Sequence, residues 1–180
     1  MWVISMISEH TLTQLCEKYN ISASKIVNKN NNILTYGEYL EIDEVLNYLT
    51  NELKIDSRNI EKCPSILYRK VNSIKFNVKF LKAKNIEFNN IESCLHVLSS
   101  DVEELKETYN YVINNYEKSC INKITSILSV PKDIIVDVEN LNIPFDNKID
   151  NLSVATGIEW GSTTLEEIQK IIRSEEFKTY

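Results

Sequence analysis

The chain has 180 residues, of which 43% are hydrophobic and 26% are charged, a balance typical of a soluble globular domain rather than a disordered tail. Its three Gly and three Pro are too few for the frequent tight turns of a β-sandwich or β-barrel, so a helical protein is expected. The net charge of −6 would repel nucleic acids and anionic membranes as a global field, so such contacts would need a local basic cluster.

The beginning of the chain, MWVISMISEH, has neither a basic segment nor a small-residue cleavage site of the kind that directs export. No stretch approaches 18 uninterrupted apolar residues, so we expect no membrane contact and a cytoplasmic location. The abundance of Ile, Asn and Lys, which AT-rich codons specify, is typical of an AT-rich bacterial or phage genome.

A phrase recurs along the chain. NIEKCPSIL at residues 59–67 returns as NIESCLHVL at residues 90–98, and each copy ends in a pair of apolar residues. The pairs are spaced by 33, 31 and 30 residues: Ile33-Leu34, Ile66-Leu67, Val97-Leu98 and Ile127-Leu128. Periods of this length indicate stacked helical units that share one core, so the sequence predicts about four repeats of 30–33 residues.

Each phrase leads into a predicted long helix. Leu67 is followed by Val71, Ile74 and Val78 at helical spacing, and we expect a helix of roughly 16 residues there. Asp56 or Ser57, Asn89 and Ser22 are candidate helix N-caps, and Pro64 suits the first turn of a short helix. The predicted fold is therefore an all-α helical-repeat solenoid, with a repeat domain at residues 1–140.

The window between Glu61 and Glu87 contains no acidic residue. Its candidate nucleic-acid-binding residues are Arg69, Lys70, Lys75, Lys79, Lys82 and Lys84. Lys75, Lys79 and Lys82 share one predicted helix face, and three phosphate contacts would give a salt slope of about −2.7 on duplex DNA. Two alternatives stay open: a solvated face that only keeps the protein soluble, and a surface for an acidic protein partner.

Residues 141–180 fit no further repeat, and we expect them to form a C-terminal cap or tail with one helix. Thr163 and Glu166 have the spacing of a capping box at the start of that helix. Trp160 lies in the turn-forming GIEWGS segment and is a candidate anchor for a protein partner. The alternative is that this Trp packs beneath the capping helix.

The stretches VLNYLTNELKIDSRNIEKCPSIL and VNSIKFNVKFLKAKNIEFNNIESCLHVL together show an apolar helix running into a Pro-containing phrase and a hydrophobic pair. This grammar, over about residues 10–140, resembles the mitochondrial transcription termination factor family. The resemblance implies a curved superhelix of helical triplets and nucleic-acid binding through basic surface residues.

Enzymatic motifs are missing from the sequence. It has no Gly-rich phosphate loop, no nucleophile elbow and no His-x-x-x-His pair, and its four Cys form no Cys-x-x-Cys. We therefore expect no catalytic residues, no metal, no cofactor and no small-molecule substrate. His96, inside a repeat phrase, is interpreted as a structural residue.

The favoured function is thus a non-enzymatic, termination-factor-like module that contacts nucleic acid through a basic helix face. The alternative is an adaptor or inhibitor that binds another protein through its concave face or its acidic C-terminal end. Residues 131–180 hold ten Asp and Glu against five Lys and Arg, and this uneven charge suits protein recognition at one end as readily as nucleic-acid binding in the middle.

Overall fold

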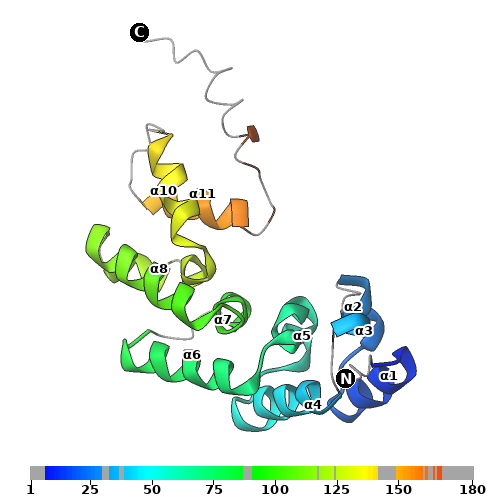
Figure 1. Cartoon of the computed structure of the whole chain (residues 1–180). Helices are drawn as coiled ribbons and strands as arrows, with labels where there is room; N and C mark the ends of the chain where they lie inside the picture. Colours follow the sequence, from blue (N-terminus) through cyan, green and yellow to red (C-terminus); the bar gives the residue numbers. More distant parts are fainter. Residues whose placement is uncertain are drawn as a thin grey trace, which may run out of the picture. The chain divides into compact units, whose positions relative to one another are not determined.

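The computed structural model describes residues 7–29, 33–36, 39–86, 91–116, 118–123, 125–141, 149–159, 161, 164, 166 and 167. Helices make up its regular structure, and no strand occurs in these residues (Figure 1). This confirms the all-α class. The chain divides into two compact units, Met1–Ser99 and Ser100–Tyr180. The sequence-based boundary near residue 140 and the solenoid arrangement stay predictions.

The first unit has two layers of helices. The elements are α1 (Glu9–Lys18), α2 (Ala23–Lys29), α3 (Ile33–Tyr36), α4 (Tyr39–Asn47) with a π-helical continuation at Tyr48–Glu52, α5 (Ser57–Lys62), a 3-10 helix η2 (Pro64–Tyr68), α6 (Val71–Ala83) and α7 (Ile91–Leu98). In one layer α1 packs on α4 and α4 on α6, while in the other α2 packs on α5 and α5 on α7 (Figure 1).

The second unit repeats the local order of a short helix, a 3-10 helix and a longer helix. Its elements are α8 (Val102–Asn115), α9 (Lys118–Lys123), the 3-10 helix η3 (Thr125–Ser129), α10 (Lys132–Asn140) and α11 (Ile149–Glu159). α8 and α11 both pack on η3, and α10 packs on α8 and α11. η3 therefore lies at the centre of this unit's contacts.

The apolar pairs identified in the sequence are buried. Ile33, Ile66, Val97 and Ile127 have no exposed surface, and Leu67, Leu98 and Leu128 are each 1% exposed. Leu34 is only half-buried. Burying such side chains supplies most of the stabilisation of a helical core, because helices this short are marginal in isolation.

Two predicted helix starts are confirmed, while the capping box and the lengths of two helices differ from the prediction. Asp56 caps α5, since its carboxylate accepts the amide of Arg58, and Pro64 opens η2. The capping box joins Thr164 and Glu167 in reciprocal bonds of 2.9 and 3.1 Å, one residue later than predicted. α6 and α8 have 13 and 14 residues, slightly shorter than expected.

Three turns of the first unit share one backbone conformation. Asn20, Lys54 and Asn85 have φ of 55°, 57° and 53°, and each directly precedes a buried or half-buried Ile. At two of them the next amide bonds back into the helix, Ile21 to the carbonyl of Cys16 and Ile86 to that of Leu81, as in a Schellman motif. Asn and Lys thus take the left-handed position that Gly usually occupies, so these three turns form without Gly.

In the part of the chain described above, no helix is both long and apolar enough to cross a membrane.

Candidate nucleic-acid interface

α6 carries most of the basic residues predicted from the sequence. Its inner side consists of Ile74, Asn77, Val78 and Leu81, which are all buried. The Asn77 side-chain amide donates to the carbonyl of Leu98 over 3.2 Å and so ties α6 to the end of α7. With this side fixed, the opposite side of α6 must face solvent.

Four of the six predicted cations are exposed: Arg69, Lys70, Lys79 and Lys82. Among the described residues, none of these four is held in an ion pair or a side-chain hydrogen bond. Lys79 and Lys82 are three residues apart, and therefore lie on neighbouring turns of the same helix face. Their charge is available to an anionic partner.

The other two predicted cations are held by neighbouring side chains. Lys75 is half-buried, with its Nζ 3.8 Å from a Glu52 carboxylate oxygen and 4.9 Å from the centre of the Tyr48 ring. Lys84 Nζ lies 5.7 Å from the centre of the Phe80 ring. The acid-free window in the sequence did not reveal Glu52, because that residue is brought to α6 by the packing of α4.

An aromatic flank lies beside these lysines. Phe76 is 40% exposed, and Phe80, one turn later, is half-buried. Sequence reasoning did not assign these residues. Unpaired bases of single-stranded nucleic acids stack on exposed aromatic rings that lie next to cations. This flank therefore offers a contact for single strands that a paired duplex would not use.

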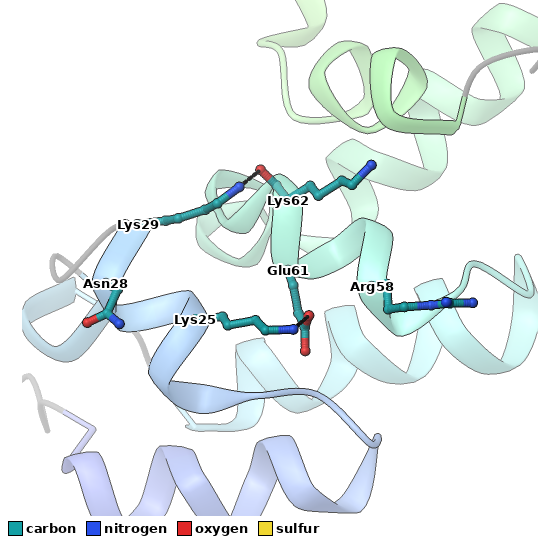
Figure 2. Close-up of a pocket in the computed structure, with 6 residues that line it drawn as sticks. All are labelled: Lys25, Asn28, Lys29, Arg58, Glu61 and Lys62. Carbon is teal, nitrogen blue, oxygen red and sulfur yellow. Dashed lines mark hydrogen bonds and ion pairs between the residues drawn. The ribbon is translucent and has the colours of Figure 1, made fainter.

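A second basic cluster lies between α2 and α5, around a pocket of about 460 Å³. The residues that line it are Lys25, Asn28, Lys29, Arg58, Glu61 and Lys62 (Figure 2). Sequence reasoning missed this cluster, because its cations come from two segments with acidic residues between them, and the nearest cations of the two, Lys29 and Arg58, are 29 residues apart.

Glu61 connects the two walls of this pocket. It is 8% exposed, and its two carboxylate oxygens accept the backbone amide of Ser22 and the Nζ of Lys25, each over 2.8 Å. The Lys25 ammonium, together with the Ser22 amide, holds the pKa of Glu61 below its usual value. The carboxylate therefore stays charged and fixes α2 against α5.

Two further cations of the pocket, Lys29 and Arg58, have defined hydrogen bonds. Lys29 Nζ donates to the Lys62 carbonyl over 3.1 Å, and a carbonyl contact does not cancel the ammonium charge (Figure 2). Arg58 forms a fork to Asp56, with both of its bonds 3.1 Å long. Since Asp56 caps the same helix, Arg58 is anchored at the start of α5.

The second unit has a smaller polar concavity of about 180 Å³, lined by Asn115, Tyr116, Glu139 and Asn151. Glu139 accepts the hydroxyls of both Tyr111 and Tyr116. Burial and the Glu139 carboxylate raise the pKa of Tyr111 to about 12, and they also raise the pKa of Tyr116. The carboxylate is thus satisfied by neutral donors.

The described thiols and imidazoles differ in their exposure. Cys16 and Cys63 are buried, and burial raises the pKa of the Cys16 thiol to about 11, which disfavours the reactive thiolate. His96 is half-buried, and His10 is exposed. Within the described ranges, no three His, Cys, Asp or Glu side chains are grouped so that they could hold a metal ion. Trp160 lies outside the described residues.

Comparisons with known proteins gave no match: no family model, no curated protein and no solved structure is similar to this chain.

Proposed function

We propose that this chain is a non-enzymatic helical-repeat module that binds the phosphate backbone of nucleic acid through α6 and the residues just before it. The observation that carries the proposal is the set of four exposed cations, Arg69, Lys70, Lys79 and Lys82, none of them engaged by an acid among the described residues. Cations in this state can release phosphate counterions without first breaking an internal ion pair.

The helical-repeat part of the proposal draws support from local structure. The aliphatic pairs that recur at 30–33 residues are buried apart from the half-buried Leu34, and the left-handed turns at Asn20, Lys54 and Asn85 recur at similar spacing. The resemblance to the mitochondrial transcription termination factor family is in keeping with both the repeat and the basic surface. It stays part of the proposal.

The expected binding is salt-sensitive and largely independent of sequence. Four phosphate contacts give a slope of about −3.6 on duplex DNA, so affinity falls about 150-fold between roughly 50 and 200 mM salt. Backbone contacts carry no base information. The exposed ring of Phe76 favours single strands over duplexes, because only unpaired bases present a face for stacking.

Charge reversal tests the proposal. We expect the double variant Lys79→Glu, Lys82→Glu to lose retention on immobilised single-stranded oligonucleotide at about 50 mM salt, with thermal unfolding nearly unchanged, because both side chains are exposed. Lys118→Glu, Lys132→Glu is the matched control. It makes the same change in net charge at two exposed lysines of the second unit and should leave retention within about two-fold. Equal losses in both variants would mean that only net charge matters.

The alternative, a protein-binding adaptor, is favoured by two other surface features. Leu40 is 72% exposed at the start of α4, and Asp101, Glu103, Glu104 and Glu107 give α8 an exposed acidic edge. A partner held at either surface should stay bound after nuclease treatment. It should be lost on Leu40→Ser if it binds at α4, and on Glu104→Lys if it binds at α8. If nuclease releases the partner, nucleic acid bridges the two proteins.

A further inference from the structure

Lys75 and Glu52 form a weak ion pair at the edge of the proposed interface. The Lys75 Nζ lies 3.8 Å from a Glu52 carboxylate oxygen, which is longer than a charge-assisted hydrogen bond of about 2.8 Å. The two side chains are 42% and 54% exposed, so water and salt screen their attraction. Exposed pairs of this kind contribute little to stability, and this one can therefore open at low cost.

The lysine of this pair continues the basic stripe of α6. Lys75, Lys79 and Lys82 are separated by four and three residues, so they lie on one side of the helix over about 10 Å of its axis. Lys79 and Lys82 are exposed, whereas Glu52 offsets the charge of the third lysine. A strand that follows this stripe from Lys82 toward the start of α6 therefore brings a phosphate to the Lys75–Glu52 pair.

The π-helical turn after α4 holds the Lys75 ammonium by a second contact. The turn closes where the Leu53 amide donates to the Tyr48 carbonyl over 3.0 Å. Tyr48 and Glu52 are four residues apart in this turn, and the Lys75 Nζ also lies 4.9 Å from the centre of the Tyr48 ring. Tyr48 is only 7% exposed and is fixed by packing, whereas the exposed Glu52 side chain can turn toward water. The ring can thus keep the ammonium in place after the carboxylate has left.

A strand phosphate and the Glu52 carboxylate compete for this ammonium. Each carries one negative charge, so the two anions repel each other when both lie close to Lys75. A phosphate of a strand already bound to the rest of α6 has a high effective concentration at this position, because its neighbours hold it there. The phosphate can therefore replace the carboxylate, which returns to water.

We propose that Lys75 is a fifth phosphate contact of the interface on α6, and that Glu52 is the internal anion which it exchanges for a phosphate when a single strand binds. This inference rests on the proposed function, because it needs a strand on α6. The exchange adds little to the salt dependence of the wild type, since the freed carboxylate takes up a cation when the phosphate releases one. Removal of the Glu52 charge should therefore strengthen binding and steepen its salt dependence.

The test measures the affinity of the full chain for a short fluorescent oligothymidylate by anisotropy, between about 50 and 200 mM salt. We expect Glu52→Gln to bind about three-fold more tightly than the wild type at about 50 mM salt, with thermal unfolding nearly unchanged. Its plot of log affinity against log salt should be steeper by about 0.7, the increment of one phosphate contact on a single strand. The matched control is Glu17→Gln, which removes the same charge from an exposed side chain of α1 and should leave affinity and slope unchanged.

A Lys75→Gln background separates this exchange from general repulsion. If Glu52 acts by holding Lys75, then Glu52→Gln should steepen the salt dependence only in a chain that retains Lys75. An equal increase in slope with and without Lys75 would mean that Glu52 only repels the strand, and it would overturn the inference. Unchanged affinity and slope in Glu52→Gln would overturn it too, while a loss of binding in Lys79→Glu, Lys82→Glu would still support the proposal for α6. Absence of binding by every protein, including the wild type, would overturn both.

Discussion

The two compact units share a local order of helices but differ in charge. Met1–Ser99 contains 12 basic and 11 acidic side chains, a formal charge of +1, whereas Ser100–Tyr180 contains 8 basic and 15 acidic side chains, a formal charge of −7. Their partly buried carboxylates differ in the same direction. Glu61 in the first unit has an ammonium partner, while Glu139 in the second accepts two neutral tyrosine hydroxyls.

This difference teaches how a chain with a net charge of −6 can still present a basic surface. In the first unit the buried Glu61 carboxylate is paired with Lys25, whose side chain is exposed, and Lys62 of α5 and Lys79 and Lys82 of α6 also lie at the surface. In the second unit two tyrosine hydroxyls satisfy the Glu139 carboxylate and add no positive charge. The two units therefore differ in the sign of their formal charge.

The largest expected effect tests whether the two units have equivalent cores. Leu67 and Leu128 each follow a fully buried Ile in a 3-10 helix, and each is 1% exposed. Leu67→Ala and Leu128→Ala should each lower the free energy of unfolding by about 2–5 kcal/mol, because a buried aliphatic side chain is replaced by a cavity. Urea denaturation measures the loss.

Hydrogen exchange assigns each loss to a unit. Amides of α5–α6 should lose protection in Leu67→Ala, and amides of α8–α10 in Leu128→Ala. The exposed Leu40→Ala should change stability by less than about 0.5 kcal/mol and serves as the control. A uniform loss over the whole chain in both variants would show that the units unfold together.

A smaller effect is expected from the ionic carboxylate of the first unit. Glu61→Gln should lower stability by about 2 kcal/mol at pH 7, since it weakens a charge-assisted bond to the Ser22 amide and removes the pair with Lys25. Glu61 has a lowered pKa in the folded state. Its stabilisation is therefore fully present above the unfolded value of about 4.5 and is lost as the pH falls through the folded pKa.

Urea titrations of wild type and Glu61→Gln at pH 7 and pH 3 test whether the stabilisation by Glu61 decreases at low pH. The difference in stability between the two proteins should shrink at the lower pH. A constant difference would mean that the shape of the Gln side chain, rather than the lost charge, causes the effect.

The neutral partners in the second unit predict the opposite pH dependence. The pKa of Tyr111 is raised to about 12, and the pKa of Tyr116 is also raised. The two hydroxyls therefore stabilise the fold fully below about pH 10, the ordinary pKa of tyrosine. This stabilisation is lost as the pH rises from that value through the folded pKa values. Tyr116→Phe should cost about 1.5 kcal/mol at pH 7, because Glu139 loses a donor. Absorbance of tyrosinate during alkaline titration, together with stability at pH 7 and 10.5, measures both effects. If all tyrosines ionise near pH 10, the raised pKa values of Tyr111 and Tyr116 are wrong.

The sequence predicts those features that depend on a residue and its near neighbours. The buried columns at Ile66 and Ile127, the proline at the start of η2 and the Asp56 cap all follow from spacing and residue type. The contacts of Lys75 do not, because Glu52 reaches it only through the packing of α4 on α6.

The pocket between α2 and α5 escapes sequence reasoning for the same reason. Ser22 and Glu61 are 39 residues apart, and neither residue carries a local signal of the other. Lys54 in a left-handed turn is a different case. Gly and Asn mark such turns in a sequence, while Lys does not, so only the backbone reveals that this turn matches those at Asn20 and Asn85.

A substitution in the Lys54 turn has the smallest expected effect, and it should increase stability. Lys54 is exposed with φ of 57°, a conformation that costs a residue with a Cβ atom roughly 1 kcal/mol and costs Gly almost nothing. Lys54→Gly should therefore raise the free energy of unfolding by about 0.5–1 kcal/mol. Asn85→Gly should gain less, because Asn tolerates this region better than Lys. Loss of stability in Lys54→Gly would mean that the flexibility that Gly adds to the unfolded chain outweighs the relief of strain.

In the second unit α8 ends in extended backbone at Tyr116, so Tyr116→Gly should only destabilise the protein. Thermal unfolding of the three variants compares the two ways of ending a long helix.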